Sequence, residues 1–198
     1  MEFIDKLKHR RSYREFEPES FDIQLLVNAI EAAKYAPSGA NKQPWTFCIV
    51  QNQEIKKEIR MQAEKAESSF YKKIPLHWQQ DLEHLNVSID KPFLEKAPYL
   101  IVIFKQVYQI DKDGEHTKVY YPDISGGIAT GMLIAALTDL GLDILTYTPS
   151  ESQFLSDILE RPDNEKPFLI IVCGKGSKSY KLPKITKKAN DEVIKIYW

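Results

Sequence analysis

An apolar segment over residues 123–140, with three glycines on neighbouring helical turns, constrains the fold of this chain more than any other feature. Its length and composition predict one long helix, in which Gly126, Gly127 and Gly131 leave room for another helix to approach closely. A helix this apolar is expected to be buried, in the core or at an interface. The length of 198 residues, 43% of them hydrophobic, suits a single domain over 1–198.

Helical and strand-like segments alternate irregularly along the rest of the chain. Residues 22–36 place apolar side chains at helical spacing, and helix-forming residues dominate 52–70. Runs of β-branched and aromatic residues predict strands over 45–51, 99–107, 142–146 and 168–172. This mixture predicts the α+β fold class. Prolines and polar residues interrupt the pattern before the second strand, and we interpret that region as a mobile insertion.

The balance of charge excludes a global attraction for nucleic acid or anionic membranes. The 27 basic and 28 acidic residues give a net charge of -1, so any anion site must be local. The sequence has neither a secretory signal nor a stretch of transmembrane length, so we expect a cytoplasmic protein. Cys48 and Cys173 lie in apolar runs typical of buried, reduced thiols. Metal-binding spacings, a dinucleotide fingerprint and a nucleophile elbow are absent from the sequence.

The first candidate site is the run Arg10-Arg11-Ser12-Tyr13-Arg14. Its three guanidinium groups and intervening hydroxyl can surround a phosphate with charge-assisted, bidentate hydrogen bonds. The same residues are equally consistent with a solvated basic turn, so the run alone does not decide between the two interpretations.

The second candidate is the loop 36–45, which joins a helix end to a strand through small residues with exposed backbone N–H groups. Such a loop can lie against a flat ligand, and Ser38 and Asn41 could hydrogen-bond to a heterocycle or its ribityl chain. Taken by itself, the loop is explained more simply as a helix C-cap followed by a turn.

The third candidate is Thr146-Tyr147-Thr148-Pro149, a hydroxyl-rich strand end that follows the glycine-containing helix. A hydroxyl at such a position can face a redox centre. On spacing alone, the β-propensity of threonine is the simpler explanation.

The order of these motifs resembles the nitroreductase superfamily over nearly the whole chain. The resemblance rests on RRSYR near the N-terminus, APSGANKQPWTF further along, and GLDILTYTP after the glycine-containing helix. Three more stretches are similar to the iodotyrosine deiodinase branch in particular: FLEKAPYLIVIFKQV, YYPDISGGIATGMLIAALTDLGL and RPDNEKPFLIIVCGKG.

The resemblance implies a mixed, mostly antiparallel sheet flanked by helices, in an intertwined homodimer whose C-terminal segments embrace the partner subunit. It implies FMN as the cofactor, bound at the dimer interface by residues of both protomers. The apolar tail that ends in Trp198 and the glycine-containing helix are both consistent with such a dimer.

The resemblance also implies which residues contact the flavin. The expected cofactor-binding residues are Arg10, Arg11, Ser12, Tyr13, Arg14, Pro37, Ser38, Gly39, Thr146, Tyr147, Thr148 and Lys187. Lys187 stands where an arginine is expected, which keeps the charge but loses the bidentate geometry. Thr148 is the expected catalytic residue, because its hydroxyl would donate to flavin N5 and favour single-electron steps.

The resemblance implies a substrate site covered by a mobile active-site lid over 62–95. The expected substrate-binding residues are Ala40, Glu67, Tyr71 and Lys91. The backbone N–H of Ala40 would hold a phenolate against the flavin, while the other three side chains would bind an amino-acid zwitterion. Glu67 and Tyr71 stand four residues apart and therefore share a helix face.

The register of the lid depends on one assumed deletion. Without the deletion, Ala66 and Phe70 would occupy the positions that we assign to Glu67 and Tyr71. A further alternative is that Glu67 simply faces solvent on a polar helix.

The leading hypothesis is FMN-dependent reductive dehalogenation of halotyrosines, with the substrate phenolate stacked on the flavin. The alternative among flavoenzymes is a broad-specificity NAD(P)H-dependent nitroreductase or quinone reductase. A flavin-binding module without halotyrosine activity would leave Glu67, Tyr71 and Lys91 without a purpose. A purely structural protein would leave the three motifs unexplained.

Overall fold

The computed structural model of the chain describes every residue except 1, 74, 76–77, 79–84 and 86. At its centre, the described residues form an antiparallel sheet of four strands in the order β1 (Trp45–Val50), β2 (Tyr99–Gln106), β6 (Glu165–Gly174) and β5 (Asp143–Tyr147). An isolated parallel bridge between Ser12 and Ile144 joins the N-terminal segment to the edge strand β5. The expected mixed, mostly antiparallel sheet is therefore confirmed.

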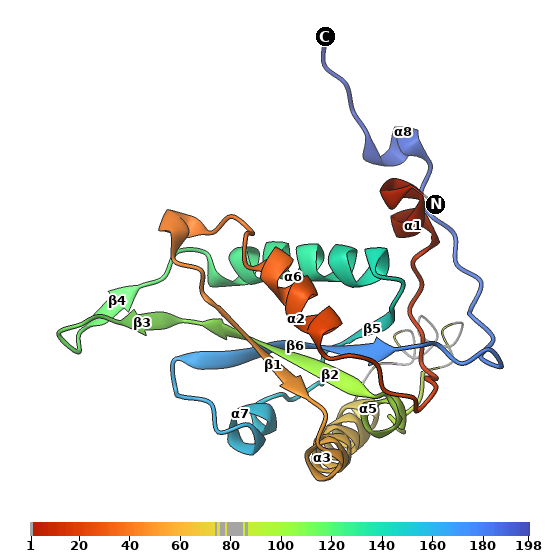
Figure 1. Ribbon diagram of the computed structural model, residues 1–198, viewed down its shortest axis with the longest axis horizontal. Coiled ribbons are helices and arrows are strands. Elements are labelled where there is room, and N and C mark those ends of the chain that lie inside the picture. Colours follow the sequence, from red (N-terminus) through yellow and green to blue (C-terminus); the bar gives the residue numbers. More distant parts are fainter. Residues whose placement is uncertain (1, 74, 76–77, 79–84, 86) are drawn as a thin grey trace.

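Helices cover both faces of the sheet (Figure 1). One face carries α2 (Gln24–Ala33) and α6 (Pro122–Asp139), and the other carries α3 (Gln53–Tyr71), α5 (Phe93–Lys96) and α7 (Phe154–Ile158). Successive residues of β2 point to opposite faces, so Ile101 packs with the first group and Val102 with the second. The two apolar layers on either side of the sheet form the core, as expected for the α+β class.

α6 is the long apolar helix that the sequence predicts, and it ends just before Gly141, which has a positive φ of 76°. Its inner side belongs to the core layer shared with α2. On its outer side, a Cβ added to Gly127 or Gly131 would meet nothing within 4 Å among the described residues. Ile124 and Ile128 are exposed on the helix. Within a single chain the helix is thus buried on one side only.

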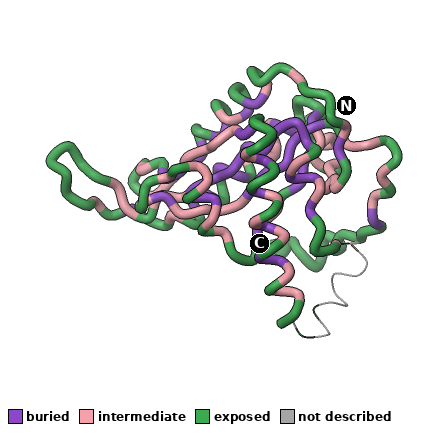
Figure 2. The backbone as a smooth tube through the Cα atoms, turned by 90° about the horizontal axis from the view of Figure 1, so that it is seen from below, coloured by how far each residue is buried: buried purple, intermediate pink, exposed green. Residues whose placement is uncertain are grey.

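A two-stranded arm, formed by β3 (Tyr108–Ile110) and β4 (His116–Lys118), projects from the body and is largely exposed (Figures 1 and 2). The side chain of Asp111 closes the turn at its tip: Asp111 Oδ1 accepts hydrogen bonds from the backbone N–H groups of Asp113 and Glu115, both at 2.9 Å. The flanking strands were not predicted, because three-residue strands carry too little of the alternating pattern.

The C-terminal segment projects from the body of the protein (Figure 1). α1 (Phe3–His9) and α8 (Asn190–Val193) lie at the same end of the molecule, and the last residues extend away from the body (Figure 1). The apolar residues of this tail are exposed within the described part of the chain, Trp198 among them.

Two further expectations concern the lid and the cysteines. α3 forms the first part of the expected lid over 62–95, and residues 74, 76–77, 79–84 and 86 of that range lie outside the described residues.

Cys173 is buried, and burial raises its pKa to about 12, which suits a structural thiol. None of the described helices combines the length and apolar character needed to cross a bilayer.

Candidate active site

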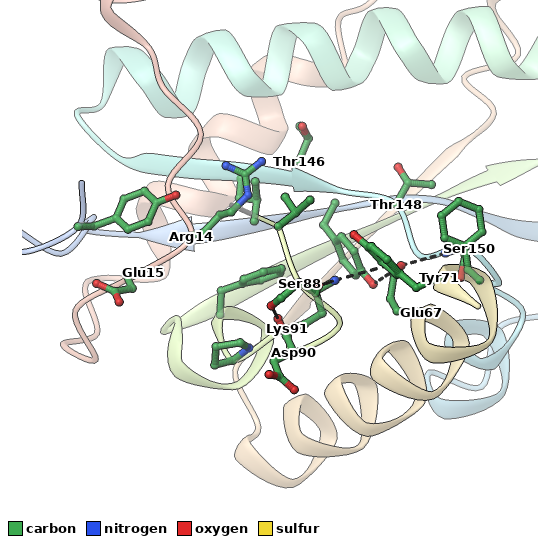
Figure 3. A pocket seen from close by; sticks show the side chains of 17 residues that line it. Arg14, Glu15, Glu67, Tyr71, Ser88, Asp90, Lys91, Thr146, Thr148 and Ser150 are labelled. Atoms are coloured by element: carbon green, nitrogen blue, oxygen red, sulfur yellow. Dashed lines mark hydrogen bonds and ion pairs between the residues drawn. The ribbon is translucent and has the colours of Figure 1, made fainter. Parts of the chain in front are cut away.

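A cavity of about 570 Å³ opens beside the carboxyl end of β5. Its wall combines the last turns of α3, residues from 87–93 and 145–150, and the N-terminal segment (Figure 3). The predicted site residues that line this cavity are Arg14, Glu67, Tyr71, Lys91, Thr146, Tyr147 and Thr148. These predicted residues, which come from four separate parts of the sequence, therefore meet at one place.

The spacing of polar residues along α3 places four of them on one side of the helix, and Glu67 and Tyr71 at its end line the cavity. Arg60, Glu64, Glu67 and Tyr71 follow one another at intervals of four, three and four residues, so they share one face of the helix. The side chain of Asn52 caps the first turn and fixes where the helix begins.

The register of α3 decides which groups reach the cavity. Ala66 is buried and is not part of the cavity wall, whereas Phe70 lines the wall together with Glu67 and Tyr71. The rings of Phe70 and Tyr71 pack edge to face, with centroids 5.9 Å apart. The structure thus brings the Glu67 carboxylate and the Tyr71 phenol into the site, the two groups assigned to it when one deleted residue is assumed.

Glu67 and Lys91 form a buried ion pair in the cavity wall. Lys91 Nζ lies 3.5 Å from Glu67 Oε2, and the two side chains are only 7% and 9% exposed. Glu67 Oε1 accepts hydrogen bonds from the Tyr147 hydroxyl at 3.1 Å and from the backbone N–H of Ser150 at 3.4 Å. Lys91 Nζ also donates to the carbonyl oxygen of Ser88. Removing one partner of such a pair typically costs about 3–5 kcal/mol, because the other charge stays buried without compensation.

Burial shifts the pKa of the groups around this pair. It lowers the pKa of Lys91, and the Glu67 carboxylate opposes that shift. It raises the pKa of Tyr71 and raises the pKa of Tyr147 much further, with Glu67 adding to both shifts. Both phenols therefore stay protonated at neutral pH. Lys91 Nζ lies 5.7 Å from the centroid of the Tyr71 ring and 5.9 Å from that of Tyr147, close enough for cation–π attraction.

The end of β5 separates two kinds of side chain. Thr146 and Thr148 lie on the opposite side of the strand from Tyr147, because side chains alternate along a strand, and both threonines are exposed. Figure 3 shows the Arg14 guanidinium on the same side of β5 as Thr146. Two hydroxyls and a guanidinium thus line the same cavity.

The arginine run is bonded along the edge of β5. The backbone N–H of Tyr13 donates to the carbonyl oxygen of Ile144 at 3.1 Å. The Tyr13 ring packs directly on Gly176, where a Cβ would collide with it. Only a glycine at position 176 lets the ring lie there, and the run is held against the sheet as a result.

Arg10 and Arg11 line a second, smaller cavity next to this edge. Arg11 donates to the carbonyl oxygen of Pro183. None of the ion pairs found among the described residues involves Arg10, Arg11 or Arg14. These guanidinium groups are therefore available to bind an anionic group such as a phosphate.

The small-residue loop before β1 lies elsewhere, beside the β3–β4 arm. Gln109 Nε2 donates to the carbonyl oxygen of Lys42 at 2.7 Å, and a Cβ on Gly39 would lie 2.6 Å from Tyr120 Cβ. Ser38 Oγ accepts from the backbone N–H of Gln43 at 2.9 Å and so closes the loop.

Ala40 adopts a left-handed conformation with a φ of 50°, and Asn41 and Gln43 also have positive φ values. A non-glycine residue in this conformation typically lowers the stability of the folded protein by about 1 kcal/mol. Backbone strain of this kind is frequent at functional sites.

Two groups of predicted cofactor-binding residues are therefore not brought together within one chain. Pro37, Ser38 and Gly39, with the predicted substrate contact Ala40, line neither of the two cavities. Lys187 lies in the exposed segment before α8 and lines neither cavity. Within a single chain, these residues are therefore separate from the residues that line the two cavities.

Comparison with known proteins identifies the fold. The model of the nitroreductase family matches residues 7–175 of the sequence. The chain belongs to the nitroreductase family, in its iodotyrosine deiodinase branch. Iodotyrosine deiodinase of Haliscomenobacter hydrossis is 42% identical over 99% of this chain and 89% of its own length. Iodotyrosine deiodinase 1 of Homo sapiens is 36% identical over 98% of this chain and 68% of its own length.

A solved structure of the same branch has the same fold. The crystal structure of oxidized iodotyrosine deiodinase bound to FMN and 3-iodo-L-tyrosine superposes with a TM-score of 0.85 at 30% identity, over 99% of this chain and 98% of that one. A nitroreductase from Desulfitobacterium hafniense DCB-2 superposes with a TM-score of 0.73 at 20% identity, which shows the shared fold alone.

Some residues of this nitroreductase-family site were missed by the sequence analysis. Glu64 Oε1 accepts a hydrogen bond from the backbone N–H of Lys91 at 2.7 Å, and Arg60 Nε donates to the same carboxylate at 2.7 Å. Burial acts to raise the pKa of Glu64, but the two hydrogen bonds and the positive charges of Arg60 and Lys91 together outweigh it, so the pKa lies below its usual range. The shared helix face with Glu67 could have revealed Arg60 and Glu64. Nothing in the sequence indicates the contact of Ser150.

We expect Glu64→Ala to loosen the segment that carries Lys91. The substitution removes the acceptor of the Lys91 N–H, so amide hydrogen exchange at Lys91 should accelerate about tenfold, the effect of one charge-assisted hydrogen bond. Glu58→Ala is the matched control, because it makes the same change of residue type at an exposed position of α3. Equal exchange at Lys91 in both variants would contradict a role for Glu64 as an anchor.

Proposed function

We propose that this protein is an FMN-dependent dehalogenase that removes halide reductively from halotyrosines. The observation that carries the proposal is the buried Glu67–Lys91 pair, which places one negative and one positive group in the same cavity as Arg14 and Thr148. Such a site suits a ligand with both an ammonium and a carboxylate. The relatives named iodotyrosine deiodinase, and the related structure bound to FMN and 3-iodo-L-tyrosine, support the same conclusion.

The residues present fit a flavin mononucleotide. Arg10, Arg11 and Arg14 have no carboxylate partner among the described ion pairs and flank the edge of β5, which suits the phosphate and the ribityl chain. The exposed Thr146 and Thr148 would border the ring system. When bound, FMN supplies the redox chemistry that these side chains lack.

A homodimer completes this site. Pro37, Ser38 and Gly39 do not line the two cavities that the arginines border in one chain, so a second copy would supply them across the interface. The exposed outer side of α6, with Ile124 and Ile128, offers an apolar surface of the kind that subunit interfaces cover. The exposed C-terminal tail, including Lys187, would then reach over the partner subunit.

Binding of the substrate would exchange one set of ion pairs for another. The α-ammonium of a halotyrosine takes the place of Lys91 beside Glu67, and its carboxylate takes the place of Glu67 beside Lys91. The charges stay compensated throughout, which avoids the cost of an unpaired buried charge. Tyr71 adds a donor from the same helix face as Glu67.

Thr148 would determine whether electrons pass from the flavin one at a time. The net change replaces a carbon–halogen bond with a carbon–hydrogen bond and releases halide, which consumes two electrons and one proton. The Thr148 hydroxyl is exposed at the end of β5 and would donate a hydrogen bond to flavin N5. Such a bond favours electron transfer in single steps, which suits loss of halide from an aromatic ring.

We expect 3-iodotyrosine to quench the flavin fluorescence of the FMN-loaded protein saturably, and we expect Glu67→Gln and Tyr71→Phe to weaken that binding. Loss of a charged partner or of a hydrogen-bond donor should raise the Kd about tenfold or more. Tyr35→Phe is a suitable control, because Tyr35 is exposed and does not line the cavity. No saturable response in wild-type protein with bound flavin would leave a general nitroreductase as the better description.

We expect Thr148→Ala to separate two activities. Iodide release from 3-iodotyrosine should fall by about 10- to 100-fold, because the variant loses the hydrogen bond that favours single-electron steps. Reduction of a nitroaromatic, which proceeds by hydride transfer, should be retained. Parallel assays of both reactions in one protein preparation would test this, and an equal loss of both activities would contradict the assigned role.

A further inference from the structure

We infer that Tyr147 is a specificity-determining residue: its hydroxyl holds Glu67 Oε1 in place, so that Glu67 Oε2 is free to bind the α-ammonium of an amino-acid ligand. The inference rests on the proposed function and adds a residue to the group that would select amino acids over simple phenols. Tyr147 was expected only to border the flavin.

The strand places Tyr147 between the two halves of the site. It is the last residue of β5, and its side chain points away from the side on which Thr146 and Thr148 lie. Its hydroxyl reaches Glu67 on α3, 80 positions away in the sequence. The hydrogen bond therefore connects two elements of the site. One is the strand end with Thr146 and Thr148, whose hydroxyls would border the flavin, and the other is the helix with the carboxylate that would bind the substrate.

The two oxygens of Glu67 have different partners. Oε1 accepts from the Tyr147 hydroxyl at 3.1 Å and from the Ser150 backbone N–H at 3.4 Å, and both donors belong to the β5 end and its continuation. Oε2 faces Lys91 Nζ at 3.5 Å. A ligand carboxylate can attract Lys91 away from Oε2, whereas Oε1 is held by two donors of the neighbouring strand end and loop. One oxygen is thus fixed and the other is exchangeable.

The Tyr147 ring is held independently of its hydroxyl. It packs edge to face against Phe93, with ring centroids 5.6 Å apart and an interplanar angle of 76°. It belongs to the residues packed against the core layer beneath α3. Tyr147→Phe should therefore keep the ring in place and remove only the hydroxyl that orients Glu67.

The test compares two ligands in wild-type protein and in Tyr147→Phe, both loaded with FMN. 3-Iodotyrosine carries the zwitterion, and 2-iodophenol carries the same halophenol without it. We expect Tyr147→Phe to raise the Kd of 3-iodotyrosine about tenfold and to leave the Kd of 2-iodophenol unchanged. Flavin fluorescence quenching measures both constants without turnover.

Tyr99→Phe is the matched control. The Tyr99 hydroxyl is also buried and donates to the carbonyl oxygen of Phe21 at 2.7 Å, but it lies in the other core layer. Its loss should leave the ratio of the two dissociation constants as in the wild type. In a Glu67→Gln background, Tyr147→Phe should have little further effect on 3-iodotyrosine, because the two residues act as one unit.

The outcomes separate the inference from the function on which it rests. A wild-type protein that binds both ligands equally would refute the halotyrosine proposal itself. A wild-type preference for 3-iodotyrosine that survives unchanged in Tyr147→Phe would overturn the role of Tyr147 alone. Equal weakening of both ligands, or failure of Tyr147→Phe to fold, would also overturn it, because the hydroxyl would then support the pocket in general.

Discussion

The buried pair between Glu67 and Lys91 is the interaction around which the rest of the site is arranged. The two charges lie 3.5 Å apart with side chains less than a tenth exposed. A pair of this kind adds little net stability, because desolvation of both groups offsets their attraction. The presence of the pair is better explained by function, since the ammonium and the carboxylate of a zwitterion can each replace the partner of the same charge.

The fold holds this pair at the meeting point of elements that are distant in sequence. Glu67 comes from α3 and is anchored by Tyr147 and Ser150 at the end of β5. Lys91 is held at its backbone by Glu64. On the other side of β5, the two threonines are exposed and the arginine run is half-buried in the single chain. A single chain thus provides the charge pair and one group of the residues proposed to bind the flavin, and in the proposed homodimer the second copy would provide the others.

The sequence predicted those features that depend on local pattern. The apolar, glycine-containing helix and the β-branched strands appear close to their predicted bounds. The β3–β4 arm was missed, since three-residue strands have almost no periodicity. The register that brings Glu67 and Tyr71 to the cavity was one of two open alternatives, because it depends on tertiary contacts. The hydrogen bonds from Tyr147 and Ser150 to Glu67 span 80 and 83 positions of the sequence, so no local pattern encodes them.

A crystal structure of the FMN-loaded protein with 3-iodotyrosine tests the central claim most directly. The account predicts that Lys91 Nζ leaves Glu67 Oε2 for the ligand carboxylate, that Oε2 accepts from the ligand ammonium, and that Oε1 keeps its bonds to Tyr147 and Ser150. An intact Glu67–Lys91 pair in the presence of bound ligand would contradict the account, because the zwitterion would then be recognised by other groups.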